Sequence, residues 1–255
     1  MPDDPVLTER RDGVLLVTLN RPDARNAVNT ALAEGIAAAL DDLDADAHLT
    51  VGVLTGAGKG FSAGMDLKAF VAGERPWVGD RGFAGIVQRS ARKPLIAAVE
   101  GFAMAGGLEI ALACDLVVAS REARLGIPEV KRSLVAAAGA LRRLPQRLPL
   151  NVAMEMALSG DPISAERAHA LGLVNRVTDP GRAVDAALEL AAAIARNGPL
   201  ALDATKEILL RQADWTEAEF WREQGEIVAP VMSSEDAREG ATAFSEKRDP
   251  VWKGR

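Results

Sequence analysis

The first two-thirds of the chain alternates short hydrophobic runs with stretches in which hydrophobic side chains recur at helical spacing. Such alternation is typical of parallel strands joined by crossover helices. Uninterrupted hydrophobic runs predict strands at 14–19, 51–55, 95–99 and 116–119. Segment 30–43 carries its hydrophobic residues on one helical face, and 107–114 is also better explained as a helix than as a strand. The pattern therefore predicts an α/β fold.

Beyond about residue 144, helical patterns rich in Ala, Leu and Glu replace the strand-like runs. Ser164 and Gly172 are suitable caps for a short helix. Longer helices are expected at 185–196, 200–212 and 217–247. Because a helical tail behind an α/β body usually packs on that body or on a neighbouring subunit, we expect two regions. These are an α/β core over 1–195 that contains the active site, and a helical region for oligomerisation over 196–255.

The composition narrows the class of protein. With 255 residues, 48% of them hydrophobic, the chain is long enough to bury a full core. One cysteine excludes an intramolecular disulfide, and two histidines leave no zinc-type ligand spacing. A net charge of −6 argues against a nucleic-acid-binding face. No hydrophobic run reaches the roughly 18 residues of a membrane helix, and residues 1–5 do not resemble a signal peptide. We expect a cytoplasmic protein without a metal site and without nucleic-acid or membrane partners.

Two glutamates are the strongest indication of chemistry. Glu109 and Glu129 each follow a turn that interrupts regular backbone, at 105–107 and at 126–128. Two carboxylates near one pocket can separate into a proton donor and a proton acceptor, because burial and mutual repulsion move their pKa values apart. The pair therefore predicts acid–base catalysis.

Each glutamate also has a simpler interpretation. A glutamate on a helix usually lies on a solvated or ion-paired face, but Glu109 is flanked by Leu108 and Ile110, which favours burial. Glu129 precedes Lys131 and Arg132 and could simply pair with these bases. The sequence leaves this alternative open for Glu129.

Two glycine-containing turns predict backbone donors. Gly106 and Gly107 open a predicted helix, where bare N–H groups and the helix dipole favour a negatively charged oxygen. A second turn over 62–66 could direct another N–H group to the same atom, which would complete an oxyanion hole. The alternative is that the glycine pair only permits close packing of the helix on a sheet.

Four segments in order resemble one family. They are Asn20-Arg21-Pro22 with Asn26-Ala27, then residues 61–67 (FSAGMDL), 101–109 (GFAMAGGLE) and 126–129 (GIPE). This set resembles the crotonase (enoyl-CoA hydratase/isomerase) superfamily over nearly the whole chain. The resemblance implies a spiral of repeated ββα units with a helical C-terminal trimerisation region that also covers the CoA site. It further implies an acyl-CoA substrate, no separate cofactor, and a homotrimer or a dimer of trimers.

The resemblance also implies roles for residues. Met65 and Gly106 would supply the two oxyanion N–H groups. Because hydratases of the family have both glutamates, we expect an enoyl-CoA hydratase, in which Glu109 activates water for attack on C3 and Glu129 handles the proton that reaches C2. The expected CoA- or substrate-binding positions are Arg25, Ala27, Ala63, Asp66, Leu67, Lys68 and, from a neighbouring subunit, Lys247.

One feature favours an alternative within the family. The tail over 234–255 is similar to that of crotonobetainyl-CoA (carnitinyl-CoA) hydratases, whose acyl group carries a quaternary ammonium ion. Such a cation favours an aromatic cage, whereas the chain has no tyrosine and its tryptophans at 77, 215, 221 and 252 are scattered. We therefore keep this substrate as an alternative, together with enoyl-CoA isomerisation. Acyl-chain selection is expected to depend on 70–87, interpreted as a mobile wall of the pocket.

A different class of enzyme is indicated by Gly60-Phe61-Ser62-Ala63-Gly64, which matches the G-x-S-x-G pattern of serine hydrolases. Asp115 and His169 would then complete the triad. However, the preceding strand is expected to end five residues before Gly60, which does not fit a nucleophile elbow. A binding module without activity is a further alternative, and both acids argue against it. Cys114 is expected to be an inert core thiol, and Arg142-Arg143 to lie on a solvated helix face.

Overall fold

A six-stranded sheet forms the centre of the molecule. The computed structural model describes residues 4–255, so the first three residues, which were part of the signal-peptide argument, lie outside the described residues. The strand order is β1-β2-β3-β6-β8-β11, with β1 antiparallel to β2 and the other neighbours parallel. The strands are β1 (Val6–Arg11), β2 (Val14–Leu19), β3 (Val51–Gly56), β6 (Leu95–Val99), β8 (Leu116–Ser120) and β11 (Arg176–Thr178). All four predicted strands are confirmed.

Two small sheets lie beside the large one. One has the order β10-β9-β7, formed by β10 (Ile163–Ser164), β9 (Arg124–Gly126) and β7 (Phe102–Met104). The other is a hairpin of β4 (Trp77–Val78) and β5 (Gly82–Phe83). The chain passes from β6 to β7 and then into helix α3 (Gly106–Ala113), and from β8 to β9 and then into a 3-10 helix, η3 (Pro128–Arg132). This is the expected spiral of strand pairs and helices.

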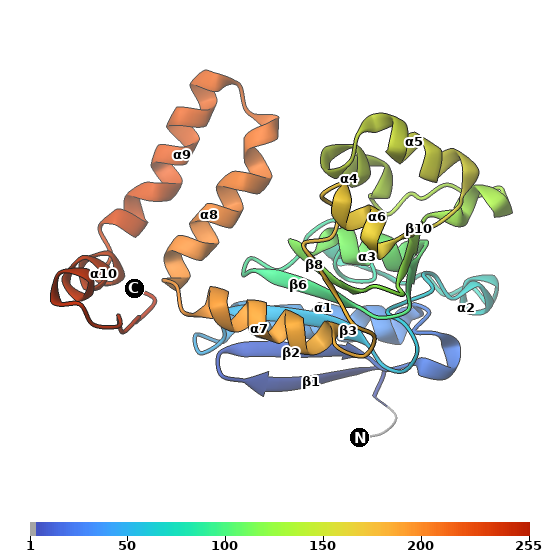
Figure 1. The fold of residues 1–255 in the computed structure, drawn as a ribbon, viewed down its shortest axis with the longest axis horizontal. Coiled ribbons are helices and arrows are strands. Elements are labelled where there is room, and N and C mark those ends of the chain that lie inside the picture. Colours follow the sequence, from blue (N-terminus) through green and yellow to red (C-terminus); the bar gives the residue numbers. More distant parts are fainter. Residues whose placement is uncertain (1–3) are drawn as a thin grey trace.

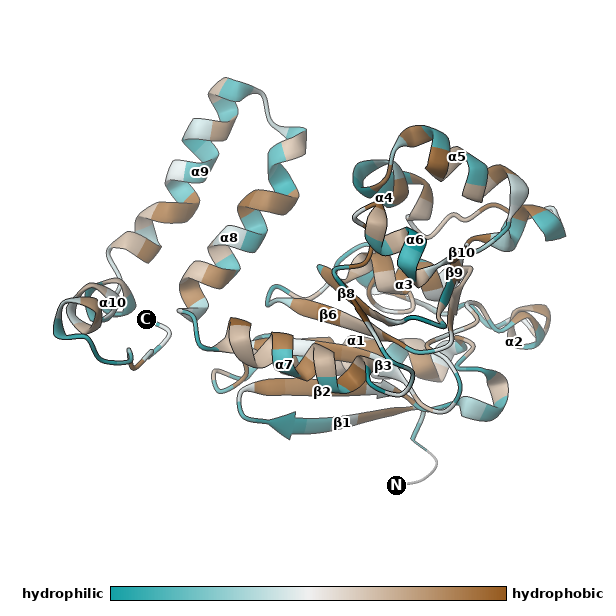
Figure 2. Cartoon of the chain, viewed as in Figure 1, coloured by the Kyte–Doolittle hydropathy of each residue, from teal (hydrophilic) through white to brown (hydrophobic). Residues whose placement is uncertain are grey.

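Helices cover both faces of the large sheet, and the alternation of side chains along each strand explains why. Leu15, Val17 and Leu54 pack in one cluster with α1 (Thr30–Ala45) and α3. The neighbouring positions Val14, Leu16 and Val53 pack in a second cluster with α7 (Ala183–Ala195), which buries three alanines. Because successive side chains point to opposite faces of a strand, uninterrupted hydrophobic runs are what a sheet buried on both faces requires. The central strands are correspondingly hydrophobic in Figure 2.

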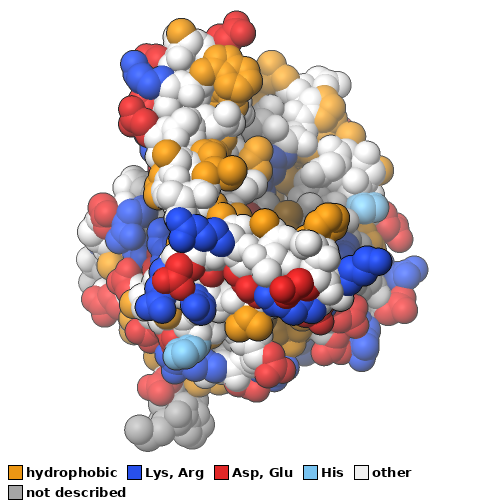
Figure 3. Space-filling view, turned by 90° about the vertical axis from the view of Figure 1, so that its left-hand side faces the viewer, with side chains coloured by type: hydrophobic (Ala, Val, Ile, Leu, Met, Phe, Trp, Pro, Cys, Tyr) orange, Lys and Arg blue, Asp and Glu red, His pale blue; other side chains and the backbone are white. Residues whose placement is uncertain are grey.

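The C-terminal helices project from this body (Figure 1). They are α8 (Pro199–Arg211), α9 (Glu217–Met232) and α10 (Glu235–Glu246). The predicted helical segment 217–247 is divided because Ser234 caps α10 by accepting a hydrogen bond from Ala237 N–H. Leu209, Leu210 and Trp221 are exposed, and hydrophobic side chains are visible along these helices in Figure 3. The expected boundary between 195 and 196 coincides with the end of α7, although a division into two functional regions stays a prediction.

The shorter helices complete the description. They are α2 (Leu67–Val71), α4 (Ala140–Arg147), α5 (Leu150–Ser159) and α6 (Ala165–Ala170), with 3-10 turns η1 (Pro22–Ala24), η2 (Gly79–Arg81) and η4 (Gln212–Asp214). As expected, helices predominate beyond about residue 144. Two strands, β10 and β11, also follow that point and were not predicted, because both are too short to show a periodic pattern. Within 4–255, no helix has the length and hydrophobicity needed to span a membrane.

Candidate active site

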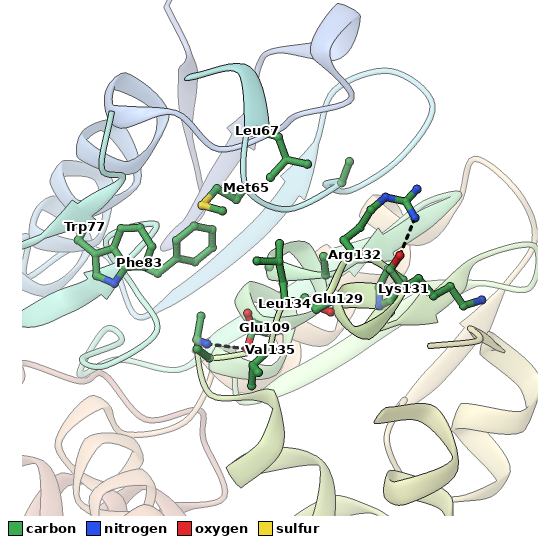
Figure 4. Close-up of a pocket in the computed structure, with 16 residues that line it drawn as sticks. Met65, Leu67, Trp77, Phe83, Glu109, Glu129, Lys131, Arg132, Leu134 and Val135 are labelled. Carbon is green, nitrogen blue, oxygen red and sulfur yellow. Dashed lines mark hydrogen bonds between the residues drawn. The ribbon is translucent and has the colours of Figure 1, made fainter. Parts of the chain in front are cut away.

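One cavity of about 330 Å³ brings together the residues that the sequence predicted for catalysis. Its walls come from the segment before α2, the β4–β5 hairpin, the start of α3, η3 and the loop that follows η3 (Figure 4). The lining residues are Ala63, Met65, Leu67, Trp77, Phe83, Ala105, Gly106, Glu109, Pro128, Glu129, Lys131, Arg132, Leu134, Val135, Ala137 and Ala138. Most are apolar, so the two glutamates stand in a largely hydrophobic chamber.

Glu109 lies in the first turn of α3 with only 3% of its surface exposed. Its Oε1 accepts hydrogen bonds from Ala138 N–H at 2.7 Å and from Ala140 N–H at 3.1 Å. Burial raises the pKa of Glu109 from 4.5 to about 7, and the negative charge of Glu129 adds to the rise, whereas the two backbone bonds oppose it. A carboxyl group with such a pKa can act as a base or an acid near neutral pH.

Glu129 lies in η3, directly after Pro128. Its Oε2 is buried and has no hydrogen-bond partner among the described residues. Burial raises the pKa of Glu129 as well. The alternative of a simple ion pair with the following bases is not observed, because Lys131 pairs with Asp161 at 2.5 Å and Arg132 donates to the carbonyl of Lys131. A buried carboxyl oxygen without a partner is costly unless a ligand or water meets it.

Met65 and Gly106 both offer unoccupied N–H groups. Within residues 4–255, neither N–H donates to a protein acceptor. Met65 forms an isolated β-bridge with Val28. The bridge uses the hydrogen bonds from Val28 N–H to the carbonyl of Gly64 and from Asp66 N–H to the carbonyl of Val28. It leaves the N–H of Met65 without a partner. Gly106 is the first residue of α3, where helix N–H groups have no partner within the helix.

Close backbone contacts hold these two donors near each other. A side chain on Gly64 would lie 2.7 Å from the Gly106 nitrogen, so only glycine fits there. Ala105, just before Gly106, has φ +54° and ψ −131°, a conformation that costs about 1–3 kcal/mol for a residue with a side chain. A side chain on Gly107 would lie 2.2 Å from the carbonyl oxygen of Ser62. The close-packing interpretation is therefore correct for Gly107, while Gly106 also supplies an open donor.

The serine hydrolase alternative is contradicted by the structure. Ser62 is fully buried, and its hydroxyl donates to the carbonyl of Asn26 at 2.7 Å and accepts from Gly64 N–H at 3.1 Å. His169 Nδ1 lies 2.8 Å from the carbonyl of Val174. Asp115 pairs with Lys206 at 2.7 Å. None of the three nominated triad residues lines the cavity, so the G-x-S-x-G match is accidental.

Of the predicted CoA-binding residues, some line the cavity and the others lie outside it. Ala63 and Leu67 line the cavity. Arg25 and Lys68 are exposed, Ala27 is partly buried, and the carbonyl of Arg25 accepts from Ala63 N–H at 3.0 Å, which ties that segment to the cavity wall. Their contacts with CoA stay predictions.

Asp66 and Lys247, the other two predicted binding residues, do not line the cavity. The carboxylate of Asp66 caps α2 by accepting from the N–H groups of Lys68 and Ala69, and it pairs with Arg21 at 3.0 Å. Its side chain is thus occupied by structural contacts. Lys247 ends α10, which lies at the opposite end of the molecule from α2 (Figure 1). Lys247 is not among the residues that line the cavity. Its expected contact with CoA from a neighbouring subunit stays a prediction.

Sequence reasoning missed an aromatic pair in the cavity. Trp77 and Phe83 face each other across the β4–β5 hairpin, with ring centroids 5.3 Å apart and planes at 64°. The scatter of the tryptophans along the sequence is therefore no evidence against an aromatic site, because Trp77 pairs with a phenylalanine, Phe83. The available signal was a pair of aromatic residues flanking Gly79 and Gly82, a spacing that a hairpin brings together.

Two further expectations need correction. Arg142 is exposed as expected, but Arg143 is half-buried, donates to the carbonyl of Val87, and its positive charge opposes the rise in the pKa of Glu109. The segment 70–87 is not a uniform loop, because residues 81–87 are buried. Arg81 anchors it through Asp41 and the carbonyls of Arg89 and Ser90. Cys114 is buried as expected.

Comparisons with known proteins confirm the family resemblance that was found in the sequence. A family model described as enoyl-CoA hydratase/isomerase matches residues 9–255. A carnitinyl-CoA dehydratase of Salmonella arizonae is 42% identical over 253 residues, which cover 96% of this chain and 97% of the relative.

Solved structures give the same result. An enoyl-CoA hydratase from Mycobacterium tuberculosis H37Rv has a TM-score of 0.97 and 55% identity, with 99% of this chain and 100% of that chain covered. A carnitinyl-CoA hydratase from Mycobacterium avium has a TM-score of 0.78 and 44% identity, with 99% of each chain covered.

Proposed function

Because the chain belongs to the enoyl-CoA hydratase/isomerase family, we propose that it is a hydro-lyase that adds water across the C2–C3 double bond of a 2-enoyl-CoA thioester, or removes it in reverse. The observation that carries this proposal is one apolar cavity with two buried carboxyl groups and the open N–H groups of Met65 and Gly106.

The two N–H groups would receive the thioester oxygen. Addition of water to C3 places negative charge on this oxygen in an enolate-like transition state. Backbone dipoles that are fixed before the reaction stabilise such charge, and one donor of this kind typically contributes about 3 kcal/mol to the lowering of the barrier. The polarised thioester is thus the electron sink, and CoA is part of the substrate rather than a separate cofactor.

Glu109 and Glu129 would then carry out the two proton transfers of the hydration. Glu109, as carboxylate, removes a proton from water while the oxygen bonds to C3. Glu129, in its protonated form, donates a proton to C2 as the enolate collapses. Water thus adds as a proton at C2 and hydroxide at C3. The pKa of Glu109, about 7, allows that group to change its protonation state near neutral pH. Burial raises the pKa of Glu129 as well, which favours the protonated form that donates to C2.

Carnitinyl-CoA is the second candidate for the acyl group. It is favoured by the names of the 42% identical relatives and by the aromatic pair in the cavity. Its dehydration product, crotonobetainyl-CoA, is itself a 2-enoyl thioester, so both candidates use the same chemistry. Isomerisation is less well supported, because moving a proton between C2 and C4 needs one base and leaves the buried, unpartnered oxygen of Glu129 unexplained.

We also propose that the chain acts as a homotrimer or a dimer of trimers. The C-terminal helices expose Leu209, Leu210 and Trp221, which would be covered by another copy. A second cavity, of about 410 Å³, lies between α8 and the body and is lined largely by apolar residues that include Leu209 and Leu210. Association would also allow Lys247 to approach a cavity in a neighbouring subunit.

The test is to replace each acid by its amide. Glu109→Gln and Glu129→Gln should each lower kcat by about 10²–10⁴-fold, because each removes one proton-transfer partner, with a modest effect on KM. The measurement is the absorbance change of the conjugated thioester with crotonyl-CoA and crotonobetainyl-CoA. Glu34→Gln, an exposed position on α1, is the matched control and should behave as wild type. Undiminished turnover in both amide variants would remove the proposal.

A further inference from the structure

The aromatic pair lies directly beside the proposed oxyanion hole. A methyl group built on Gly106 would lie 2.7 Å from Cε1 of Phe83, so the ring touches the residue that supplies one N–H donor. Phe83 is 3% exposed, and Trp77, 48% exposed, packs edge-to-face against it from the mouth of the cavity. The pair therefore forms a wall of the cavity directly beside the N–H donor of Gly106.

The position of this wall determines which part of a short acyl chain can contact the two rings. With the thioester oxygen at Met65 and Gly106 and water at Glu109, C2 and C3 lie between the donors and the acids. A substituent on C4 then begins one bond beyond the carbon that receives water. The cavity surface available to it includes the rings of Phe83 and Trp77 (Figure 4).

The charges around this wall favour a cation. Glu109 and Glu129 are the only acidic residues that line the cavity in the described part of the chain. The two basic lining residues, Lys131 and Arg132, lie on the other side of the glutamates from the aromatic pair in Figure 4. Lys131 is also paired with Asp161. A positive group near the rings thus meets acidic groups and aromatic faces, and neither of the basic residues that line the cavity lies on that side.

The hairpin that carries the rings is firmly held. Arg81, between the two strands, is 2% exposed and bonds to Asp41 on α1 and to the carbonyls of Arg89 and Ser90. Gly85, just after β5, lies so close to α1 that a side chain there would be 2.5 Å from the carbonyl of Ala33. The rings are therefore positioned before a ligand binds, which reduces the entropic cost of recognition.

We propose that Trp77 and Phe83 form a subsite for a quaternary ammonium group at C4 of the acyl chain. A desolvated cation over an aromatic face is attracted by the ring quadrupole, and tryptophan is the strongest such partner. This inference rests on the proposed hydro-lyase function and adds the feature that selects the substrate. It assigns Trp77 as the residue that distinguishes a charged acyl group from a neutral one of the same shape.

The experiment compares two substrates that differ only in charge. One is crotonobetainyl-CoA, and the other is its carbon isostere, in which a tert-butyl group replaces the trimethylammonium group. The quantity compared is the ratio of kcat/KM for the charged substrate to kcat/KM for the isostere. A substitution that weakens packing lowers both values alike, so a change in the ratio reports the contribution of the charge. Trp77→Leu should lower this ratio about tenfold, whereas Trp77→Phe should keep most of it. Glu34→Gln, at the exposed position on α1, is the control and should leave the ratio unchanged.

The outcomes separate this inference from the proposed function. If wild type hydrates crotonyl-CoA and the Trp77→Leu variant has the same substrate ratio as wild type, the subsite is overturned and the hydro-lyase assignment is left intact. A wild-type enzyme that hydrates none of the three thioesters overturns both. A Trp77→Leu protein that still turns over the isostere and shows a tenfold lower ratio supports the subsite, and the retained turnover shows that the variant is folded.

Discussion

Replacement of Glu109 by glutamine should stabilise the protein while it removes activity. The pKa of Glu109 is raised from 4.5 to about 7 chiefly by burial. Between these two pH values the folded chain retains a proton that the unfolded chain releases, so the free energy of unfolding falls as the pH rises through this window and is constant above it. At about 1.4 kcal/mol for each pH unit, ionisation of this buried group costs about 3 kcal/mol of stability at pH 8.

The amide removes that cost and keeps the contacts. A glutamine oxygen can still accept from the N–H groups of Ala138 and Ala140. We therefore expect the free energy of unfolding of Glu109→Gln to exceed that of wild type by about 3 kcal/mol at pH 8 and to be similar to it at pH 4.5. Glu109→Ala should be less stable than Glu109→Gln, because it leaves buried N–H groups without an acceptor, at about 1–3 kcal/mol each.

The assay is urea unfolding followed by tryptophan fluorescence, at one fixed protein concentration because association of subunits also contributes to apparent stability. Wild type, both Glu109 variants and the surface control Glu34→Gln are compared at pH 4.5 and pH 8. A Glu109→Gln protein no more stable than wild type at pH 8, or equally stabilised at both pH values, would refute the electrostatic reasoning.

Two further predictions concern catalysis. The value of kcat/KM should rise with pH through about 7, because Glu109 must be ionised to activate water; the limb should disappear in Glu109→Gln, and its persistence there would assign it to another group. Gly106→Pro should lower kcat by a further 10²–10³-fold relative to Gly106→Ala, because both add a Cβ against Phe83 but only proline lacks the N–H donor; equal rates in the two variants would argue against the oxyanion hole.

The buried strands and the acidic pair could be predicted from the sequence because each is set by local pattern. Hydrophobic runs marked strands that are covered on both faces. Glu109 among Leu108 and Ile110 indicated burial, which the 3% exposure confirms. The turns before the glutamates marked the points where η3 and α3 enter the cavity.

The remaining features depend on contacts between distant parts of the chain. β1 was missed because it is an edge strand whose side chains are mostly exposed, so it has no hydrophobic run. The spacing of Trp77 and Phe83 could have indicated a hairpin, but no pattern in the sequence predicts that Phe83 lies against Gly106. Arg143 resembled a surface residue in the sequence, but it is half-buried and donates a hydrogen bond to the carbonyl of Val87. Such pairings arise from tertiary packing and override local preference.

The close approach of Gly64 to Gly106 has a consequence for how the proposed site can change by mutation. In the mechanism proposed above, main-chain N–H groups polarise the thioester, whereas two side chains, Glu109 and Glu129, move the protons. On that proposal, a substitution at either glutamate alters the proton transfers and leaves the polarising donors in place, so different reactions could share one rigid main-chain scaffold.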